Sequence, residues 1–329
     1  MLESAAEYYA APPVGVPYSA TVPGSEQEGR TAVYRNWRCK DGLMYTLDPM
    51  VSSTHDMFES AVRQVPNARC LGHRPYDPTT KTFGPYVWET YTDIQRRKTN
   101  FGAGLVGLLE SVGVHGRQHG IGLWCQNRPE WQITDLACAS QSLYSVSIYD
   151  TLGPDTTEYI INHAELPAVC TSVSHIPTLL KLAGRCPTLK LIVSMDPLTN
   201  GTELPGTSKK DLLNALAIEK GVQIHYIGDI EALGEASPRP ANPPRPDEIV
   251  TINYTSGTTG NPKGVVLTHS AAVAAASVVL AITPMNKNDV ICSIFLWRTS
   301  SSVWWNTASC GRVLRSVTST ETFWSSSTT

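Results

Sequence analysis

The feature that most restricts the fold is a regular alternation of short apolar runs and helical patterns between residues 91 and 194. The strand-like runs are 121–125, 145–149, 168–171 and 189–194, and the helical patterns are 91–112, 130–140, 156–165 and 176–183. Parallel strands are joined by crossover helices and are buried on both faces, so each strand is apolar throughout. The alternation therefore predicts an α/β fold, with parallel sheets covered by helices.

The overall composition excludes several classes of protein. A net charge of −3 and a pI near 6.2 argue against a nucleic-acid-binding protein, which would present a basic surface. The eight cysteines are scattered without a Cys-x-x-Cys pair, and residues 1–28 lack a signal-peptide pattern, so we expect reduced intracellular thiols. The apolar run 271–282 is shorter than the roughly 18 residues that a membrane span needs. We expect it to form a helix that covers the sheet.

The run that carries most information about function is 254–264, which reads Tyr-Thr-Ser-Gly-Thr-Thr-Gly-Asn-Pro-Lys-Gly and follows the apolar run 249–252. Its glycines tolerate positive φ and let backbone N–H groups approach an anion closely. Its hydroxyl groups are rotatable donors, and its lysine is a mobile cation. These residues are Gly257, Gly260 and Gly264, then Thr255, Ser256, Thr258 and Thr259, and Lys263. The run is therefore predicted to wrap a polyphosphate, in a turn between a strand and a helix.

Other interpretations of glycine-rich sequence fit this chain less well. The Walker A spacing is absent, because Pro262 lies five residues after Gly257 and Val265 lies five residues after Gly260. An ordinary polar surface turn would not need so long an ordered run ending in Pro-Lys-Gly. The segment 102–107 matches Gly-x-Gly-x-x-Gly, but it lies inside a helical pattern and follows no strand. Its small residues are expected to allow close helix packing.

Residues 254–269 resemble the phosphate loop of the adenylate-forming enzymes, which include acyl-CoA synthetases, firefly luciferase and peptide-synthetase adenylation domains. Further runs resemble the N-terminal part of the long-chain fatty-acyl-CoA synthetases. These runs are 84–91, 100–105, 126–131, 134–139, 149–154 and 158–163. The similarity extends from about Val33 to Val290, and these flanking runs favour the long-chain subgroup over the wider superfamily.

The resemblance implies a two-step reaction. ATP and a fatty acid would form an acyl-adenylate and pyrophosphate, and CoA would then displace AMP, with Mg²⁺ neutralising phosphate charge. The phosphate contacts carried over from the motif are Thr255, Ser256, Gly257, Thr258, Thr259, Gly260 and Lys263. The family's other catalytic and metal-binding residues lie later in its pattern, so neither a catalytic residue nor a metal ligand is identified here.

The resemblance also divides the chain into three parts. Residues 1–32 are an irregular segment expected to run over the surface of the domain, and 33–290 are a partial AMP-binding N-terminal domain. The proline-rich segment 237–246 is interpreted as a spacer rather than a PxxP ligand. Residues 291–329 are rich in serine and threonine and match no element of the family, so we interpret them as an aberrant tail translated out of frame.

The chain is therefore expected to be a truncated long-chain fatty acid–CoA ligase that is inactive as written. Two alternatives stay open: another adenylate-forming ligase, and a non-catalytic fragment that binds a partner. The expected partners are a fatty acid, ATP and CoA, without nucleic acid or a transmembrane segment, and with possible peripheral association with membranes. Cytoplasm, peroxisome, endoplasmic reticulum surface and lipid droplets are all compatible locations, and acyl chain length is not determined.

The out-of-frame interpretation can be tested on the gene. The codons of residues 293–306 can be read in a shifted frame, in which the third base of each codon joins the first two bases of the next. In that frame they can encode Tyr-Leu-Pro-Leu-Ala-His-Ile-Phe-Glu-Arg-Val-Val-Glu, which the family pattern requires at this point. Trp304, Trp305 and Asn306 force the final Val-Glu of that reading. Sequencing the transcript across codon 290 should recover this reading in the alternative frame. An intact frame for the tail, without that motif in the alternative frame, would contradict it.

Overall fold

The computed structural model describes residues 11–43, 45–77, 79–149, 153–199, 208–255, 261–282, 289–293 and 315–318. Its centre is a seven-stranded sheet with the order β11-β10-β9-β7-β8-β12-β13. The strands are β7 (Gly120–Trp124), β8 (Tyr144–Ser147), β9 (Ala168–Thr171), β10 (Leu191–Ser194), β11 (Gln223–Tyr226), β12 (Ile249–Thr255) and β13 (Lys263–Thr268). Every neighbouring pair is parallel except β12–β13, which is antiparallel. The predicted α/β class is confirmed.

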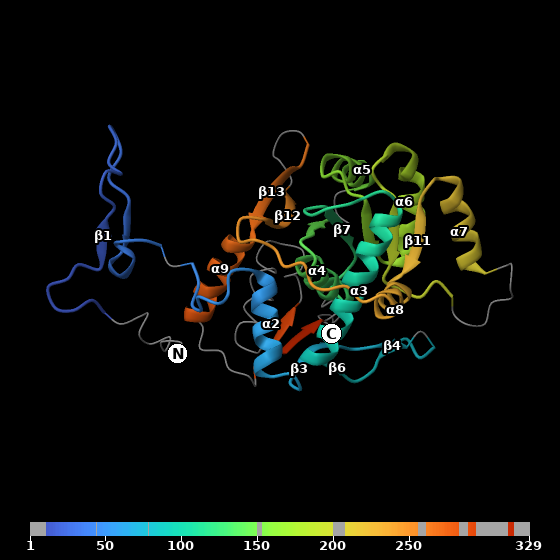
Figure 1. The fold of residues 1–329 in the computed structure, drawn as a ribbon, viewed down its shortest axis with the longest axis horizontal. Coiled ribbons are helices and arrows are strands. Elements are labelled where there is room, and N and C mark those ends of the chain that lie inside the picture. The colour runs from blue at the N-terminus through green and yellow to red at the C-terminus, as the bar shows by residue number, and fades with distance from the viewer. Residues whose placement is uncertain are drawn as a thin grey trace, which may run out of the picture.

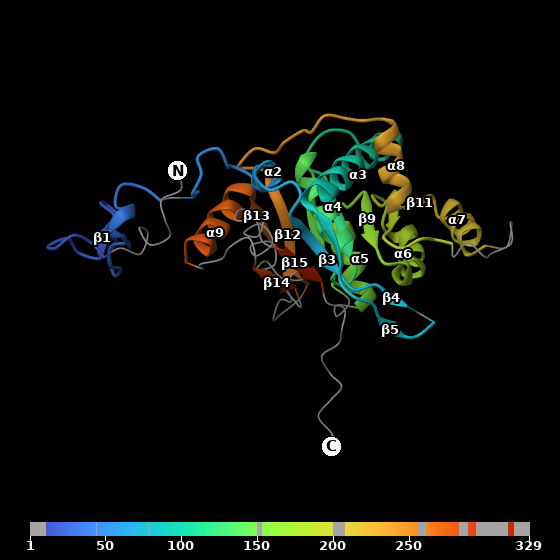
Figure 2. The ribbon, with the colours of Figure 1, turned by 90° about the horizontal axis from the view of Figure 1, so that it is seen from below.

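Helices cover both faces of this sheet (Figures 1 and 2). They are α3 (Tyr91–Ser111), α4 (Pro129–Ser140), α5 (Gly153–His163), α6 (Ile176–Leu182), α7 (Lys209–Glu219), α8 (Ile227–Ala236) and α9 (His269–Ile282). One core unites strand residues such as Val169 and Ile192 with α5, α6 and α7. The other unites Ile121 and Val193 with α3, α4 and α8. The strands β7, β9 and β10 thus contribute side chains to both cores, as their continuous apolar runs predicted.

The helix beginning at Tyr91 has a local cause that the sequence contains. The Thr90 hydroxyl accepts from the Asp93 backbone N–H at 3.1 Å, and the Asp93 carboxylate accepts from the Thr90 backbone N–H at 2.9 Å. This capping box satisfies two donors that a helix start would otherwise leave unpaired. Ser53 and Asp56 form the same arrangement at the start of α2 (Thr54–Gln64). Hydrogen bonds at fixed sequence spacing therefore set both starts.

The glycines of 102–107 lie in α3, and one of them, Gly104, allows α8 to approach closely. A Cβ at Gly104 would lie 2.1 Å from the carbonyl oxygen of Ile230, and a Cβ at Gly234 would lie 1.8 Å from that of Asn100. Glycine is therefore required on both helices at the crossing. The predicted role of this segment in close helix packing is confirmed at Gly104.

A second sheet has the order β14-β15-β3-β6 and lies beside α2. Its strands are β14 (Val290–Ser293), β15 (Arg315–Thr318), β3 (Arg69–His73) and β6 (Val87–Thr90). β15 belongs to the segment interpreted as an out-of-frame tail, and it pairs in parallel with β14 and β3. Residues 294–314 and 319–329 lie outside the described residues, so the origin of the tail stays a prediction.

The N-terminal segment differs from the expectation that it runs over the domain. β1 (Ser19–Thr21) pairs with β2 (Tyr34–Asn36) in an antiparallel hairpin that lies apart from the rest of the fold in both views (Figures 1 and 2). The pairing also crosses the expected boundary at residue 33. The remaining short elements are η1 (Trp37–Cys39), β4 (Tyr76–Asp77), β5 (Thr82–Phe83), η3 (Val173–His175) and η4 (Ala183–Arg185).

The proline-rich segment 237–246 makes specific contacts with the domain. The Arg239 guanidinium contacts the Glu110 carboxylate at 2.6 Å, and the Asn242 backbone N–H donates to the Ser140 carbonyl at 2.9 Å. The segment therefore crosses the ends of α3 and α4 and is bound to both helices, whereas its composition suggested only a spacer.

Substituting the crossing glycine should destabilise the fold in proportion to its clash. We expect Gly104→Ala to lower the free energy of unfolding by about 1–3 kcal/mol, because Ile230 backbone must move. Gly107 lies in the same helix, and its added Cβ would meet only Arg239 Nη2 at 3.8 Å. Gly107→Ala should therefore raise that free energy by about 0.5–1 kcal/mol through helix propensity. Urea unfolding measures both, and equal effects would contradict the packing role.

Candidate functional site

The predicted phosphate loop closes a β-hairpin at the carboxyl end of β12. This strand lies parallel to β8, and its last residue, Thr255, pairs with Lys263 at the start of β13. The expectation of a turn between a strand and a helix is therefore wrong. Two β-branched residues follow the loop and pair back along β12, with Val265 opposite Asn253 and Val266 opposite Ile252. Helix α9 begins only after this returning strand, at His269.

The structure describes two of the seven predicted phosphate contacts. Thr255 and Lys263 are both exposed, and the Thr255 hydroxyl lies 3.4 Å from the Lys263 carbonyl oxygen. Ser256, Gly257, Thr258, Thr259 and Gly260 lie outside the described residues, so their role stays a prediction. Both residues lie at the carboxyl edge of the parallel strands, where α/β proteins bind ligands.

Tyr254 is the last buried residue before the loop, with 3% of its surface exposed. Its hydroxyl oxygen lies 2.6 Å from Nδ1 of His163, the last residue of α5. Burial raises the pKa of Tyr254 to about 12, with the neighbouring Tyr159 and Tyr144 adding to the effect. The phenol therefore keeps its proton at neutral pH and can donate it to the imidazole.

His269 holds the other end of the hairpin. It is fully buried, and its backbone N–H donates to the Glu248 carbonyl at 3.0 Å, beside the start of β12. Its Nδ1 lies 3.1 Å from the Thr54 hydroxyl and 3.4 Å from the Thr54 backbone nitrogen, in the first turn of α2. Burial lowers the pKa of His269 to about 4. The neutral ring therefore keeps Nδ1 available as an acceptor, which ties α9 to α2.

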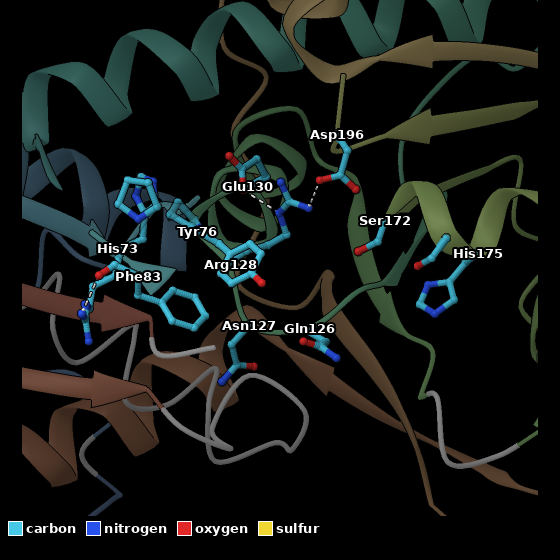
Figure 3. A pocket seen from close by; sticks show the side chains of 14 residues that line it. His73, Tyr76, Phe83, Gln126, Asn127, Arg128, Glu130, Ser172, His175 and Asp196 are labelled. Atoms are coloured by element: carbon cyan, nitrogen blue, oxygen red, sulfur yellow. Dashed lines mark hydrogen bonds and ion pairs between the residues drawn. The ribbon is translucent and has the colours of Figure 1, made fainter. Parts of the chain in front are cut away.

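A cavity of about 530 Å³ lies at the same carboxyl edge, between the loops that follow β7, β9 and β10 and the segment from β3 to β5 (Figure 3). Its lining residues are His73, Arg74, Pro75, Tyr76, Phe83, Gln126, Asn127, Arg128, Pro129, Glu130, Ser172, Ser174, His175 and Asp196. β8 lies on one side of β7 and β9 on the other, so the chain leaves β7 and β8 in opposite directions. Such a switch point opens a crevice in a doubly wound sheet.

Arg128 lies at the centre of the cavity wall (Figure 3). It donates to Glu130 Oε2 and Asp196 Oδ1, each at 2.7 Å, and to the Met195 carbonyl at 3.0 Å. Burial opposes its charge, but the two carboxylates outweigh that effect and raise the pKa of Arg128. The guanidinium is therefore an internal crosslink between the loops after β7 and β10.

Sequence reasoning did not predict this cavity as a site. The run 126–131 entered only as a resemblance, although its polar residues directly follow an apolar strand. The same signal occurs after β9 and β10, at Ser172 and Asp196. Aromatic contacts add to the polar wall, since His175 stacks on Trp124 with ring centroids 4.3 Å apart. What the sequence lacked was the strand order that brings these three loops together.

The described residues hold no group of three or more His, Cys, Asp or Glu side chains arranged for a metal ion. In this part of the chain there is also no helix with the length and apolar character that a bilayer crossing requires. The hydroxyl of Thr255 and the ammonium of Lys263 are donors of the kind that a polyphosphate needs, and their role as phosphate contacts stays a prediction.

Comparison with known proteins agrees with this arrangement. The family described as AMP-binding enzyme matches residues 58–314. The chain belongs to this family. The match covers the central sheet, the hairpin β12–β13 and most of the second sheet, so it extends beyond the phosphate loop that first indicated the family.

Two curated relatives are similar over most of the chain. Acyl-CoA ligase 891, peroxisomal, of Penicillium brevicompactum is 56% identical over 293 residues, which are 89% of this chain and 41% of that protein. Long chain acyl-CoA synthetase 7, peroxisomal, of Arabidopsis thaliana is 36% identical over 78% of this chain and 34% of that protein. The chain thus spans less than half the length of these relatives.

Solved structures confirm the fold. The A-PCP didomain of carboxylic acid reductase from Segniliparus rugosus, in complex with AMP, aligns with a TM-score of 0.67 at 17% identity, covering 81% of this chain and 39% of that one. The anthranilate CoA ligase in complex with anthranoyl-AMP aligns with a TM-score of 0.63 at 17% identity, covering 84% and 46%. At this identity the likeness concerns the fold alone.

The buried His269 should make the fold sensitive to acid. Its pKa falls from 6.5 when unfolded to about 4 when folded, so the unfolded state binds a proton that the folded state excludes. The contribution of the neutral His269 to the free energy of unfolding is complete above pH 6.5. It is lost as the pH falls towards 4, which lowers that free energy by at most about 3 kcal/mol. In His269→Asn the amide oxygen can replace Nδ1 without titrating, so urea unfolding should show a shallower decline over this range. His115 is exposed, and His115→Asn should keep the steeper slope; an equal slope in both variants would contradict the assignment.

Proposed function

We propose that the protein acts in the ATP-dependent activation of a fatty acid, as an AMP-forming acid–thiol ligase with CoA as the acceptor. The observation that carries the proposal is the hairpin β12–β13, which holds Thr255 and Lys263 at the carboxyl edge of the sheet within the run 254–264. Membership of the AMP-binding enzyme family and the names of the relatives support it. The whole reaction is a proposal, because the chain spans 41% of the Penicillium relative.

In this proposal the loop binds the outer phosphates of ATP. The contributing residues are Thr255, Ser256, Gly257, Thr258, Thr259, Gly260 and Lys263. Backbone N–H groups, hydroxyls and the ammonium neutralise charge on the β- and γ-phosphates while the carboxylate attacks the α-phosphorus in line. Mg²⁺ would be held mainly by phosphate oxygens and water, since it commonly keeps several waters at such sites.

The substrate and location are narrower proposals. A long acyl chain is favoured because the Arabidopsis relative is a long chain acyl-CoA synthetase, and the flanking runs of the sequence resemble that subgroup. A peroxisomal location is favoured because both relatives named above carry that description. Peripheral contact with a membrane would give access to a membrane-dissolved fatty acid. That the chain by itself completes neither half-reaction stays a prediction, which fatty-acid-dependent pyrophosphate exchange checks.

Removing the loop cation should weaken polyphosphate binding. We expect Lys263→Ala to raise the dissociation constant of the chain for Mg·ATP about tenfold or more, because a charge-assisted contact is lost. Isothermal titration calorimetry measures this constant, and tripolyphosphate in place of ATP should show the same loss. An effect on ATP without an effect on tripolyphosphate would place Lys263 away from the phosphates.

Lys220 offers a matched control. It directly follows α7, which lies beside β11 at the opposite edge of the sheet from the hairpin (Figure 1), and its Nζ contacts Glu219 at 2.8 Å. Lys220→Ala removes the same charge and should leave the dissociation constant within twofold of the original. Equal weakening by both substitutions would indicate a general effect of net charge and would contradict the proposed phosphate site.

A further inference from the structure

We propose that His163 is a positioning residue for the phosphate loop. By holding the Tyr254 hydroxyl, His163 fixes the Tyr254 ring. That ring in turn sets the register of the hairpin at Lys263. The inference deepens the proposed function and rests on it. His163 would not touch the nucleotide. It would act through Tyr254 on the two residues, Thr255 and Lys263, that close the loop.

The first step is the contact between α5 and β12. His163 Nδ1 lies 2.6 Å from the Tyr254 hydroxyl oxygen, and the two rings meet edge to face at 81° with centroids 5.7 Å apart. Tyr159, one turn earlier in α5, stacks on His163 at 5.1 Å and meets Tyr254 edge to face at 6.4 Å. The rings of Tyr159, His163 and Tyr254 thus pack against one another around a single hydrogen bond. This packing restricts the Tyr254 phenol to one orientation.

The second step runs from the Tyr254 ring across the hairpin. Tyr254 pairs with Gly264, the neighbour of Lys263. A Cβ at position 264 would lie 3.4 Å from Tyr254 Cζ and 3.0 Å from Ile252 Cγ2. The aromatic ring therefore lies against the glycine backbone, in the manner in which aromatic residues cover glycines on a neighbouring strand. Moving the ring would release the strand position next to the loop lysine.

The third step is the rigidity of the anchor. Ile160 and Ile161, just before His163 in α5, are fully buried in the core. The Asn162 side-chain amide donates to the Arg185 carbonyl at 3.0 Å, and the Arg185 guanidinium contacts Glu158 at 3.1 Å. The end of α5 is thus fixed on two sides. Its last side chain, His163, is exposed yet reaches the buried Tyr254, which suits a tie between helix and hairpin.

The geometry also explains why the stabilising contact between His163 and Tyr254 lies outside the loop. Both faces of β13 are open at its middle, since the consecutive residues Val265 and Val266 point to opposite faces and are 43% and 54% exposed. β13 is an edge strand in the described part of the fold, and β12 is its one neighbour there. An edge strand held on one side gains from a contact that fixes its partner's last buried side chain. That contact is the His163–Tyr254 hydrogen bond.

The experiment compares variants of the whole chain in two measurements. Isothermal titration calorimetry gives the affinity for sodium tripolyphosphate with Mg²⁺ present, and hydrogen exchange gives the protection of the backbone amides of 263–268. Tyr254→Phe and His163→Ala should each weaken binding about fivefold and accelerate exchange, the size expected for one neutral hydrogen bond. Because they break one contact, the double variant should be no weaker than either single variant.

Two further variants separate positioning from general stability. In His163→Asn the side-chain oxygen can take the place of Nδ1 as an acceptor, so affinity and protection should return close to their original values. Tyr159→Phe keeps the stacked ring and removes a neighbouring hydroxyl, so it should change neither measurement. If His163→Asn behaves like His163→Ala, or if Tyr159→Phe has the same effect as Tyr254→Phe, the hydrogen bond is not the positioning element.

The outcomes also distinguish this inference from the proposed function. If Lys263→Ala weakens tripolyphosphate binding while Tyr254→Phe and His163→Ala leave it within twofold, the phosphate site stands and the positioning role of His163 is overturned. If the original chain binds no tripolyphosphate, the proposed function fails. Hydrogen exchange then still decides whether His163 fixes the hairpin, and unchanged protection overturns that as well.

Discussion

The parallel pairing of β12 with β8 is the contact on which the candidate site depends. It places Thr251 beside Ser145 in the middle of the sheet, where both side chains are at most 1% exposed. The Ser145 hydroxyl donates to Thr251 Oγ1 at 3.1 Å, and that hydroxyl donates to the Ser145 carbonyl at 3.0 Å. A slip of one residue would break these bonds and turn Tyr254 from the core to solvent. The register of one strand pair therefore decides where the predicted phosphate loop begins.

Charged contacts hold the start of β12, which the apolar core alone would not locate. Glu248 is 6% exposed and accepts from Arg117 at 2.7 and 3.0 Å, in the bidentate geometry that guanidinium groups favour. The next backbone N–H, at Ile249, donates to the Gln118 side chain at 2.8 Å. The loop before β7 thus fixes the start of β12. His163 contacts Tyr254 near the end of β12, and His269 directly follows β13. The hairpin is held at each end by residues distant in sequence.

Local patterns were enough to predict most strands of the central sheet and most of the helices that cover it. The run 168–171 is β9 at the same residues, and the expected helix 91–112 is α3, because apolar periodicity and the Thr90–Asp93 spacing act over a few residues. The hairpin was missed for a related reason. Glycine and proline after Thr255 are compatible with either a strand or a helix to follow, and only pairing with β12 selects the strand at 263–268. The cavity around Arg128 was missed because strand order has no local signal.

The sequence by itself determined the α/β class and the chemical character of the run 254–264, since apolar runs and the choice of Gly, Thr and Lys act through each residue's own conformational and hydrogen-bonding properties. It also indicated the family, which the match over residues 58–314 shows. Tertiary structure alone decided that the loop closes a hairpin, that His163 reaches Tyr254, and that Arg128 joins Asp196 across the switch point. These contacts join segments up to 91 residues apart. Such distances close only when the strands take their order in the sheet, because burial of both faces drives that assembly without any signal between neighbouring residues.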